Sequence, residues 1–407
     1  MKKKIIFKIQ EFPHLSETFI ILQITTAIRL GFDVKILVKK ILSFEASKQL
    51  GIIENYKLSD KIILEDYKIP KNKALRLLKF LYLLFINFNS FFKIIRFYKS
   101  QNSFSLTWLY QWHFYKKFSD VSMFHIQYGT NKYPLDLLKK ADCVKGEIIV
   151  SFHGHDAVFP INGHIPNNGY YDGLFLVSKA VVANTQYLAN QIENLGCSKE
   201  ILKTIPIPVD TSFFYPNEEI KKNKDVLKLI MVSRLDPIKG HIYAFRAFKE
   251  LIDKGYKLLL IVIGEGEERE NLENYINKKQ LKDIILIGAK SQHEIRELLW
   301  QSDIFLFPSI TLPDGRRETQ GLATLEAQAC GIPVVAFNTG GIKYTIDINK
   351  TGFLCEEKNI EELSMKIQYL INNPHKRIQM GKQAVKFIAN NYSLKKIEIS
   401  WKKLYTA

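Results

Sequence analysis

The sequence predicts an α/β protein made of two doubly wound, Rossmann-like domains that face each other across a cleft. Its 407 residues suit two domains of roughly 200 residues each. Apolar residues make up 46% of the chain, which is enough for two cores. Short apolar runs alternate with segments of helical length, and this pattern is typical of parallel sheets.

The expected strands are the apolar runs themselves. In the first half they cover residues 4–9, 33–38, 123–128, 147–153, 180–184 and 202–207, and in the second half 227–234, 257–264, 283–288, 303–309 and 333–337. The first run, in "MKKKIIFKIQEF", is interrupted by Lys8 after three apolar residues. A signal peptide needs an apolar region of roughly 7–15 residues, so we expect a buried strand there instead.

A polar, charged segment containing Pro216 separates the two sets of strands. We therefore expect a first Rossmann-like domain over residues 1–216, a linker over 217–226, a second over 227–388, and a C-terminal helix over 389–407 that crosses back toward the first domain. The four cysteines are far apart and form no Cys-x-x-Cys pair. This favours a reducing cytoplasm over a disulfide framework or a structural zinc site.

The net charge of +17 is concentrated near the start of the chain, where residues 1–100 carry 19 Lys/Arg against 8 Asp/Glu. Residues 67–119 contain 10 basic and 16 aromatic residues and no acidic one. The uncharged stretch 80–92 falls short of the ~20 residues that cross a bilayer. The composition suits helices lying in an anionic membrane surface, or alternatively a buried helix pair with solvated lysines. No nucleic-acid motif is present, so we expect no nucleic-acid partner.

Polar residues that follow strands are the candidates for a site, because ligands of such sheets bind at the carboxyl ends of the strands. "VSRLDPIKG" places Arg234 and Lys239 in one loop before a helix, an arrangement suited to a diphosphate. "VIGEGEEREN" places Gly264 and Gly266 at the next strand-to-helix turn. Without a third glycine this signal is weak, and we expect a tight turn beside a nucleoside.

The stretch "RRETQGLATLEAQACGIPVV" contains two glutamates in different settings. Glu318 precedes an expected helix that ends with Gly331 at the C′ position. The amides near Gly321 and Leu322 would then point at a ligand. Glu326 lies inside the helix, and its carboxylate is suited to accept hydrogen bonds from both hydroxyls of a ribose or hexose diol.

The first half offers two further candidate loops. "SFHGHDAV" puts His153 and Asp156 directly after an expected central strand. "EFPHLSETFI" puts Ser16 and Glu17 after the first strand, where they suit an N-cap and a first-turn acid as well as a cleft loop. No cluster of metal ligands and no Asp-x-Asp pair occurs, so we expect no metal and no other cofactor.

These motifs resemble those of the retaining glycosyltransferases of group 1 (family 4), which have the GT-B fold. The resemblance rests on "SRLDPIKG", "DIFLFPS", "ETQGLATLEAQACGIPVV", "NTGGI" and "TGFL" in the second half. In the first half "FPHLSETFI", "FHIQYGTN" and "SFHGHDA" look like the exopolysaccharide branch, of colanic acid and amylovoran type. The chain departs from the family at Thr319-Gln320, where Gly-Phe is usual, and at Lys343-Tyr344, where Pro-Glu is common.

The resemblance implies a role for each candidate residue. Arg234 and Lys239, with the amides of Gly321 and Leu322, would hold the diphosphate of a nucleotide sugar. Glu326 would hold the ribose. Glu318 would contact the transferred sugar, with His153 near its reacting face.

The implied activity is metal-independent transfer of a hexose, with retention, to a lipid-linked or polysaccharide acceptor. The enzyme would act in cell-surface glycan biosynthesis, in the cytoplasm, peripherally bound to the inner face of the membrane through residues 67–119. Two other functions remain open at this point, a nucleotide-sugar epimerase on the same fold and a non-catalytic partner of polysaccharide assembly.

Overall fold

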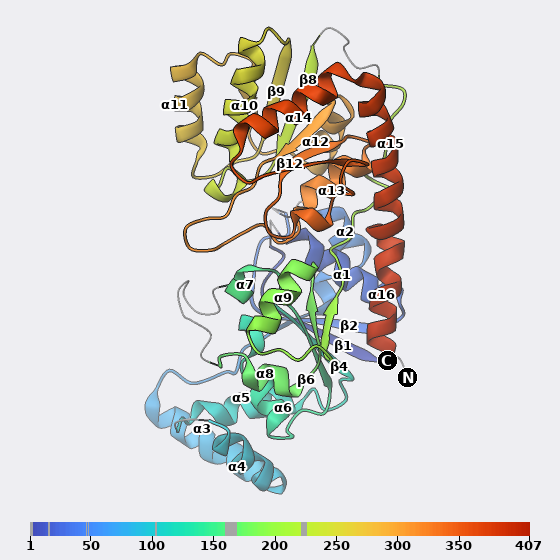
Figure 1. Ribbon diagram of the computed structural model, residues 1–407. Helices are drawn as coiled ribbons and strands as arrows, with labels where there is room; N and C mark the ends of the chain where they lie inside the picture. Colours follow the sequence, from blue (N-terminus) through green and yellow to red (C-terminus); the bar gives the residue numbers. More distant parts are fainter. Residues whose placement is uncertain are drawn as a thin grey trace. The chain divides into compact units, whose positions relative to one another are not determined.

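The computed structural model describes residues 3–14, 17–45, 47, 49–101, 104–158, 169–220 and 226–407. They form two compact units, which we call unit 1 (Met1–Ala183 and Ala189–Thr204) and unit 2 (Asn184–Leu188 and Ile205–Ala407). Each unit contains one sheet whose paired strands all run parallel. The predicted α/β class with parallel sheets is confirmed (Figure 1).

The sheet of unit 1 has seven strands among the described residues, in the order β3-β2-β1-β4-β5-β6-β7. Their bounds are β1 Lys4–Phe12, β2 Asp33–Ile41, β3 Ile62–Leu64, β4 Met123–Gln127, β5 Glu147–Ser151, β6 Ser178–Ala183 and β7 Leu202–Thr204. The helices are α1 Thr18–Arg29, α2 Leu50–Asn55, α3 Lys73–Ile86, α4 Phe91–Lys99, α5 Thr107–Lys116, α6 Leu135–Lys140, α7 His155–Val158, α8 Asp172–Val177 and α9 Gln186–Asn194.

The sheet of unit 2 has six strands in the described part of the chain, in the order β10-β9-β8-β11-β12-β13. Their bounds are β8 Leu227–Val232, β9 Leu258–Ile263, β10 Ile284–Leu286, β11 Ile304–Phe307, β12 Val334–Phe337 and β13 Gly352–Cys355. The helices are α10 His241–Asp253, α11 Arg269–Lys279, α12 Gln292–Trp300, α13 Leu322–Ala329, α14 Ile360–Asn372, α15 Pro374–Asn391 and α16 Leu394–Thr406.

Two strands were missed by the sequence analysis, β3 and β13. Both lie at an edge of their sheet and are only three and four residues long. Edge strands are half-covered, so they need not carry the continuous apolar run that marks a central parallel strand. The other two edge strands, β7 and β10, are also only three residues long, but the sequence did predict them.

Alternation along the central strands of unit 2 builds a core on each face of the sheet. Leu229 and Met231 of β8 belong to the core under α10 and α14, whereas Ile230 belongs to the core under α12 and α13. Successive side chains of a strand point to opposite faces, so an unbroken apolar strand fills both cores. The sheet is therefore covered on both sides and is accessible at the ends of its strands.

Residues 205–216, which the predicted boundary assigned to the first domain, are built into unit 2. Val209 exchanges backbone hydrogen bonds with Tyr392 and Leu394 at distances of 2.8 and 3.2 Å. Phe214 is buried in the core that also contains Tyr392. Of the predicted linker 217–226, residues 221–225 lie outside the described residues.

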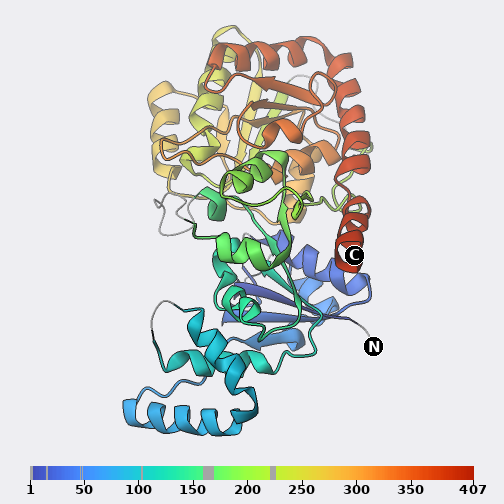
Figure 2. The same ribbon diagram turned by 60° about the horizontal axis from the view of Figure 1, so that its bottom comes forward.

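The acid-free segment 67–119 folds into α3, α4 and α5. Most residues of α5 are buried, but α3 buries only Leu83, and α4 only Ile94 and Phe97. Of the three helices in this segment, only α5 is mostly buried, so the alternative of a buried helix pair does not describe α3 and α4. Figures 1 and 2 show α3 and α4, in light blue, on the outer side of α5.

The turn between α3 and α4 is fixed by a buried amide. Asn87, 1% exposed, donates to the Leu83 carbonyl and hydrogen-bonds His113 of α5 at 3.2 Å. Its carbonyl accepts from the ammonium of Lys116 at 2.9 Å. No single described helix is long and apolar enough to cross a membrane, but α3 with residues 88–99, bent by 77°, meets that test as a pair.

Candidate active site

The candidate site of unit 2 lies where the strand order reverses, between β8 and β11. At this point the chain leaves the two strands toward opposite faces of the sheet, which opens a crevice at their carboxyl ends. The loop after β8 carries Arg234 and Lys239, and the loop after β11 carries Glu318. The structure therefore brings together Lys239 and Glu318, which the sequence singled out in separate motifs.

The loop after β8 is held by its own polar side chains. Asp236 accepts from the amide of Ile238 at 3.1 Å and caps a short 3-10 turn over Pro237–Lys239. The buried ring of His241, at the start of α10, hydrogen-bonds the Ser233 hydroxyl at 3.0 Å. Burial, aided by the nearby Lys239, lowers the pKa of His241 to about 4, so this ring is neutral at physiological pH.

Arg234 and Lys239 lie in different environments. The guanidinium of Arg234 is largely exposed and lies 3.5 Å from the Asp236 carboxylate. Lys239 instead reaches the carboxylate of Glu318, and both side chains of this pair are at most 16% exposed. The Lys239 ammonium also lies 5.3 Å from the centre of the Phe307 ring. Lys239 is thus held by its partners in a shielded position, while Arg234 remains exposed to solvent.

Glu318 is an ionised carboxylate in a shielded position. Burial alone would raise the pKa of Glu318, but the Lys239 ammonium and the amides of Gly321 and Thr319 outweigh it and lower the pKa. The Gly321 amide donates to the Glu318 carboxylate at 3.3 Å. The Glu318 carboxylate therefore contacts the Lys239 ammonium and backbone amides just before α13, and both kinds of group favour an anion.

Helix α13 begins at Leu322, with Gly321 at its N-cap in a left-handed conformation (φ 73°). A Cβ atom on Gly321 would lie 2.5 Å from Cδ1 of Ile342, so only glycine fits there. The prediction that Gly331 occupies the C′ position is confirmed, because its φ is 80° and Ile332 donates back to Ala327. Glu326 lies half-buried in the second turn of the helix.

Gly264, which the sequence analysis placed beside a nucleoside, lets two loops pack backbone against backbone. A Cβ atom on Gly264 would lie 1.8 Å from the Ser233 carbonyl oxygen, and one on Gly266 would lie 2.2 Å from that of Leu235. The Leu235 amide donates to the Glu265 carbonyl at 2.9 Å. These glycines therefore fix the position of the Arg234 loop.

Thr319 and Gln320, two of the residues that depart from the family pattern, make specific hydrogen bonds. The Thr319 carbonyl accepts from the Thr185 hydroxyl at 2.8 Å. The buried amide of Gln320 accepts from the backbone amide of Ile207 at 3.0 Å and donates to its carbonyl at 2.8 Å. Both residues thus anchor the loop that carries Glu318 to segments 184–188 and 205–209 of unit 2.

Sequence reasoning missed a third carboxylate at this edge of the sheet. Glu357, after β13, accepts from the amide and the hydroxyl of Thr311 at 2.6 and 2.8 Å. The same hydroxyl lies 3.3 Å from that of Thr339, after β12. Burial would raise the pKa of Glu357, but the hydrogen bonds from Thr311 lower it. Isolated threonines and a glutamate in a polar loop give no sequence signal that separates them from surface residues.

In unit 1, His153 lies just beyond the carboxyl end of β5. Its Nε2 is 2.9 Å from the side-chain oxygen of Gln127, whose amide nitrogen donates to Gln23 at 2.7 Å. Because the Gln127 oxygen can only accept, His153 carries its proton on Nε2. The ring packs against Phe19 and Tyr128, and burial lowers the pKa of His153 to about 3.

Asp156 is buried and holds two loops of unit 1 together. Its carboxylate accepts from the amide of Gly129 at 2.8 Å and from those of His153 and Gly154, both at 3.0 Å. Burial raises the pKa of Asp156 to about 6, although these backbone donors act in the opposite direction. Asp156 therefore positions the His153 loop from inside the fold.

Glu17 opens onto a polar pocket of about 470 Å³ at the carboxyl ends of β1, β2 and β4. It stands at the N-cap of α1 rather than in the first turn, and its carboxylate accepts from the Tyr128 hydroxyl at 2.8 Å. Burial raises the pKa of Glu17. Glu11, His14 and Lys39 also line this pocket. Ser16, the other residue predicted in this loop, lies outside the described residues.

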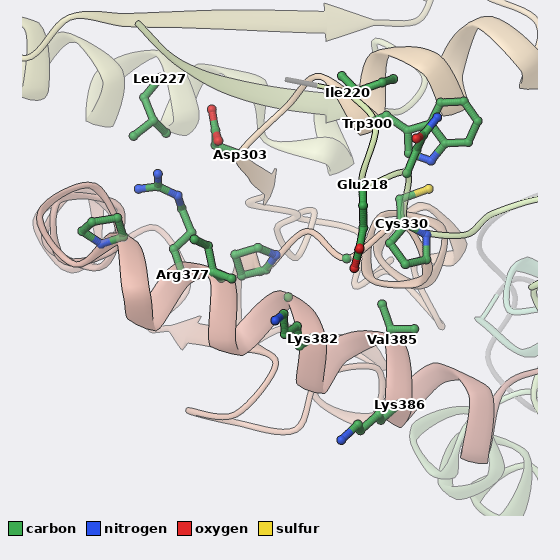
Figure 3. A pocket seen from close by; sticks show the side chains of 17 residues that line it. Glu218, Ile220, Leu227, Trp300, Asp303, Cys330, Arg377, Lys382, Val385 and Lys386 are labelled. Carbon is green, nitrogen blue, oxygen red and sulfur yellow. The ribbon is translucent and has the colours of Figure 1, made fainter. Parts of the chain in front are cut away.

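A larger pocket of about 910 Å³ occurs in unit 2 at the opposite ends of the strands (Figure 3). Leu227 and Asp303, at the amino ends of β8 and β11, line one side, and Arg377, Lys382 and Lys386 of α15 line the other. None of the predicted site residues faces it. Among the described residues, no group of three or more His, Cys, Asp or Glu side chains is placed to hold a metal ion.

Comparisons with known proteins agree with this architecture. Residues 216–387 match the family model described as glycosyl transferases group 1. The putative colanic acid biosynthesis glycosyltransferase WcaL of Escherichia coli K12 is 30% identical over 233 residues, 56% of each chain. The amylovoran biosynthesis glycosyltransferase AmsK of Erwinia amylovora is 27% identical over 379 residues, 89% of each chain. The matched region thus spans about half of WcaL and most of AmsK.

Among solved structures, Anabaena HepE in complex with UDP and glucose is similar over 100% of both chains, with a TM-score of 0.73 and 16% identity. Two Rossmann-like units, together with this structural likeness, show the GT-B fold. Within that fold, residues 216–387 match the group 1 glycosyl transferase family, and the chain is similar in sequence to WcaL and AmsK.

Proposed function

We propose that this chain is a metal-independent, retaining glycosyltransferase that moves a hexose from a nucleotide-diphosphate sugar to a lipid-linked or polysaccharide acceptor. The observation that carries the proposal is the contact between Lys239 and Glu318 beside the N-terminus of α13. This arrangement puts a fixed cation, a carboxylate and helix amides at the strand-order reversal of a group 1 domain.

The donor fits these groups by charge. Lys239 and the exposed Arg234 would neutralise the diphosphate, and the amides of Gly321 and Leu322 would donate to its oxygens. Glu318 would accept hydrogen bonds from the hydroxyls of the transferred sugar. Glu326, half-buried in the second turn of α13, would accept from the ribose hydroxyls.

The chemistry follows from the position of these charges. In the proposed reaction the bond between the anomeric carbon and the donor phosphate breaks, and a bond from the same carbon to the acceptor oxygen forms on the same face. The acceptor proton passes to an oxygen of the departing phosphate. Lys239, Arg234 and the helix amides stabilise the negative charge that develops there, which is the largest catalytic term such a site can supply.

His153 would act on the transferred sugar as a neutral hydrogen-bonding group. Its pKa of about 3 rules out an imidazolium acid at physiological pH. The carbonyl of Gln127 fixes its tautomer, and Asp156 fixes the backbone before it through the His153 amide. The polar pocket around Glu17 is the proposed place of the acceptor in unit 1.

The pathway and the cellular place are part of the same proposal. WcaL and AmsK are named for colanic acid and amylovoran biosynthesis, which supports exopolysaccharide assembly for this chain. Half of the exposed large apolar side chains in the described part of the chain lie between Leu75 and Phe104. With the surrounding lysines they support peripheral binding of α3 and α4 to the anionic, cytoplasmic face of the membrane.

The test is a transfer assay with purified protein and a panel of UDP-, GDP-, ADP- and dTDP-sugars, preceded by a thermal-shift screen to select the donor. We expect product in the presence of EDTA, with the anomeric configuration of the donor retained by NMR. Lys239→Met and Glu326→Ala should each abolish most of the transfer. Glu326→Ala should preserve the melting temperature without donor, whereas Lys239→Met should lower it, because the shielded Glu318 carboxylate loses its cation. Full activity in both variants would refute the proposed site.

Incubation with donor alone separates the transferase from an epimerase on the same fold. A transferase releases the nucleotide slowly by hydrolysis, whereas an epimerase yields a second nucleotide sugar. Conversion of the donor in the absence of acceptor would therefore overturn the proposal. Failure of all of these sugars to raise the melting temperature would instead favour a non-catalytic role.

A further inference from the structure

A groove between α3, α4 and α5 in unit 1 is not accounted for by the proposed reaction. It has a volume of about 450 Å³, within the ~300–1,000 Å³ range of small-molecule sites. Its lining is almost wholly apolar and includes Phe80, Leu84, Ile94, Ile95, Phe104 and Trp108. An apolar groove that faces water does not stabilise the fold, because its walls are not removed from water. Exposed apolar surface of this kind usually marks a binding site.

The few polar atoms of the groove are either engaged or at its edge. The Tyr98 hydroxyl donates to the Ser105 carbonyl at 3.1 Å, and its ring packs edge-on against Trp108 at 5.2 Å. Among the described residues that line the groove, Lys99, the last residue of α4, is the one that carries a charge. The groove can therefore accept a long apolar group, with a single cation for a polar head.

The surface around the groove also carries apolar and basic side chains. Phe85, Phe88 and Phe92, at the turn between α3 and α4, are 81%, 71% and 83% exposed. Lys93 and Arg96 lie on the exposed side of α4, and the Arg96 guanidinium lies 3.9 Å from the Asp142 carboxylate. Exposed aromatic rings next to exposed cations suit a layer of hydrocarbon chains with anionic head groups.

We propose that this groove holds one hydrocarbon chain of an anionic, phosphate-bearing membrane lipid, with Lys99 near the phosphate. The inference rests on the membrane association proposed above and makes it specific, because a chain in the groove would fix α3 and α4 at a defined depth. The rigid turn at Asn87 supports this role, since its hydrogen bonds to His113 and Lys116 hold both helices against α5.

The test uses the fluorescence of Trp108, which lines the groove and is 8% exposed. The full-length protein is mixed with phosphatidylcholine vesicles containing phosphatidylglycerol, whose acyl chains are either brominated or not. Bromine quenches tryptophan only at short range. We expect quenching in the wild type, loss of most of it in Trp108→Phe, and its retention in Trp112→Phe, the neighbouring tryptophan of α5.

A groove-filling variant, Leu84→Phe with Ile95→Phe, keeps the exposed rings and the lysines. We expect it to float with anionic vesicles as the wild type does, but to lose several-fold of the bromine quenching. Equal quenching in this variant and the wild type would overturn the proposal. Vesicle binding without any quenching of Trp108 would also overturn it, and would leave the groove to an apolar segment of a partner protein.

The outcome is independent of catalysis, because neither donor nor acceptor is present in the quenching experiment. Transfer to a short-chain, water-soluble acceptor is measured on the same variants. Loss of quenching with full transfer activity identifies the groove as the lipid site alone. Quenching without transfer in the wild type would contradict the proposed enzyme and leave the lipid site standing.

Discussion

The ammonium of Lys239 lies against the carboxylate of Glu318, although the two residues are 79 positions apart in the chain. One comes from the loop after β8 and the other from the loop after β11. The pair lies largely out of water, so each partner compensates a charge that would otherwise be costly to bury. A bound diphosphate would compete with Glu318 for Lys239, which couples donor binding to the position of the Glu318 loop.

Removing the cation should lower both activity and stability, because Glu318 then keeps its charge in a shielded position without a partner. We expect Lys239→Met to lower kcat/KM by roughly 10²–10³-fold, the usual cost of losing one group that stabilises developing charge. The matched control is Lys249→Met, which breaks an exposed pair with Asp253 on the outside of α10. That variant should transfer as the wild type does in steady-state assays. Equal losses in the two variants would show that the effect is not specific to the site.

Gly321 should tolerate no side chain. We expect Gly321→Ala to lower the free energy of unfolding by about 1–3 kcal/mol, because the left-handed backbone is strained and the methyl group meets Ile342. Gly255→Ala separates the two causes, since φ is 88° there but nothing lies within 4 Å of the added Cβ. Urea unfolding should show the smaller loss for Gly255→Ala. A loss as large as that of Gly321→Ala would exclude the contact with Ile342 as a cause.

Acid should destabilise unit 1 through its buried histidines. Burial lowers the pKa of His125 to about 3, against about 6.5 in the unfolded chain. The stability from a depressed histidine pKa is complete above about pH 6.5 and declines as the pH falls toward 3, by up to ~1.4 kcal/mol per pH unit. We expect His125→Gln to make the fall in urea midpoint from pH 6.5 to pH 4 shallower. His375→Gln, at an exposed position, should leave the slope unchanged, and a slope unaltered by both changes would refute the prediction.

Replacing Gln320 should lower the stability of the fold rather than change donor preference. Replacing it with leucine removes both hydrogen bonds to the backbone of Ile207, and we expect a loss of about 1–3 kcal/mol in the free energy of unfolding. Gln301→Leu, on the exposed residue after α12, should change stability little. Should the Gln320 variant keep full stability and change only its donor preference, Gln320 would be a substrate contact and not an anchor.

Membrane binding should depend on the charges of α3 and α4. We expect the triple change of Lys73, Lys93 and Lys99 to glutamate to abolish flotation with anionic vesicles, because these lysines are exposed. Lys79 is a poor choice, since its ammonium donates to the Lys68 carbonyl and lies over the Tyr110 ring.

The same change at Lys278, Lys279 and Lys282 of unit 2 alters the net charge equally and serves as the control. That control should float as the wild type does. Equal loss of flotation in both triple variants would mean that net charge, and not this surface, governs binding.

The fold was predictable because its signals are local and repeated. Central parallel strands are apolar on both faces, so β8 and β9 stand out in any window, and Gly331 ends α13 as its position predicts. The edge strands β3 and β13 have only three and four residues and were missed. The pairing of Val209 with Tyr392 joins segments far apart in sequence, so no local signal marks it.

The sequence predicted individual residues of the candidate site but not the contacts between them. Position after a strand identified Lys239 and Glu318, but nothing in the spacing shows that their side chains meet. The same holds for Asp156, which sequence reasoning placed in a cleft loop and which the structure buries against three amides. Contacts between loops depend on the geometry of the backbone, and no single residue in the sequence predicts that geometry.

The packing of Gly264 against the Ser233 carbonyl has a consequence for how such a protein can change over evolution. The loops that frame the site rest on one another through main-chain atoms, as they also do where Gly341 meets the Thr319 carbonyl. Mutations of the side chains that project from these loops leave the main-chain contacts between the loops unchanged. A lineage could therefore exchange one sugar nucleotide for another by successive point mutations while keeping the scaffold, with the glycines as the positions it cannot vary.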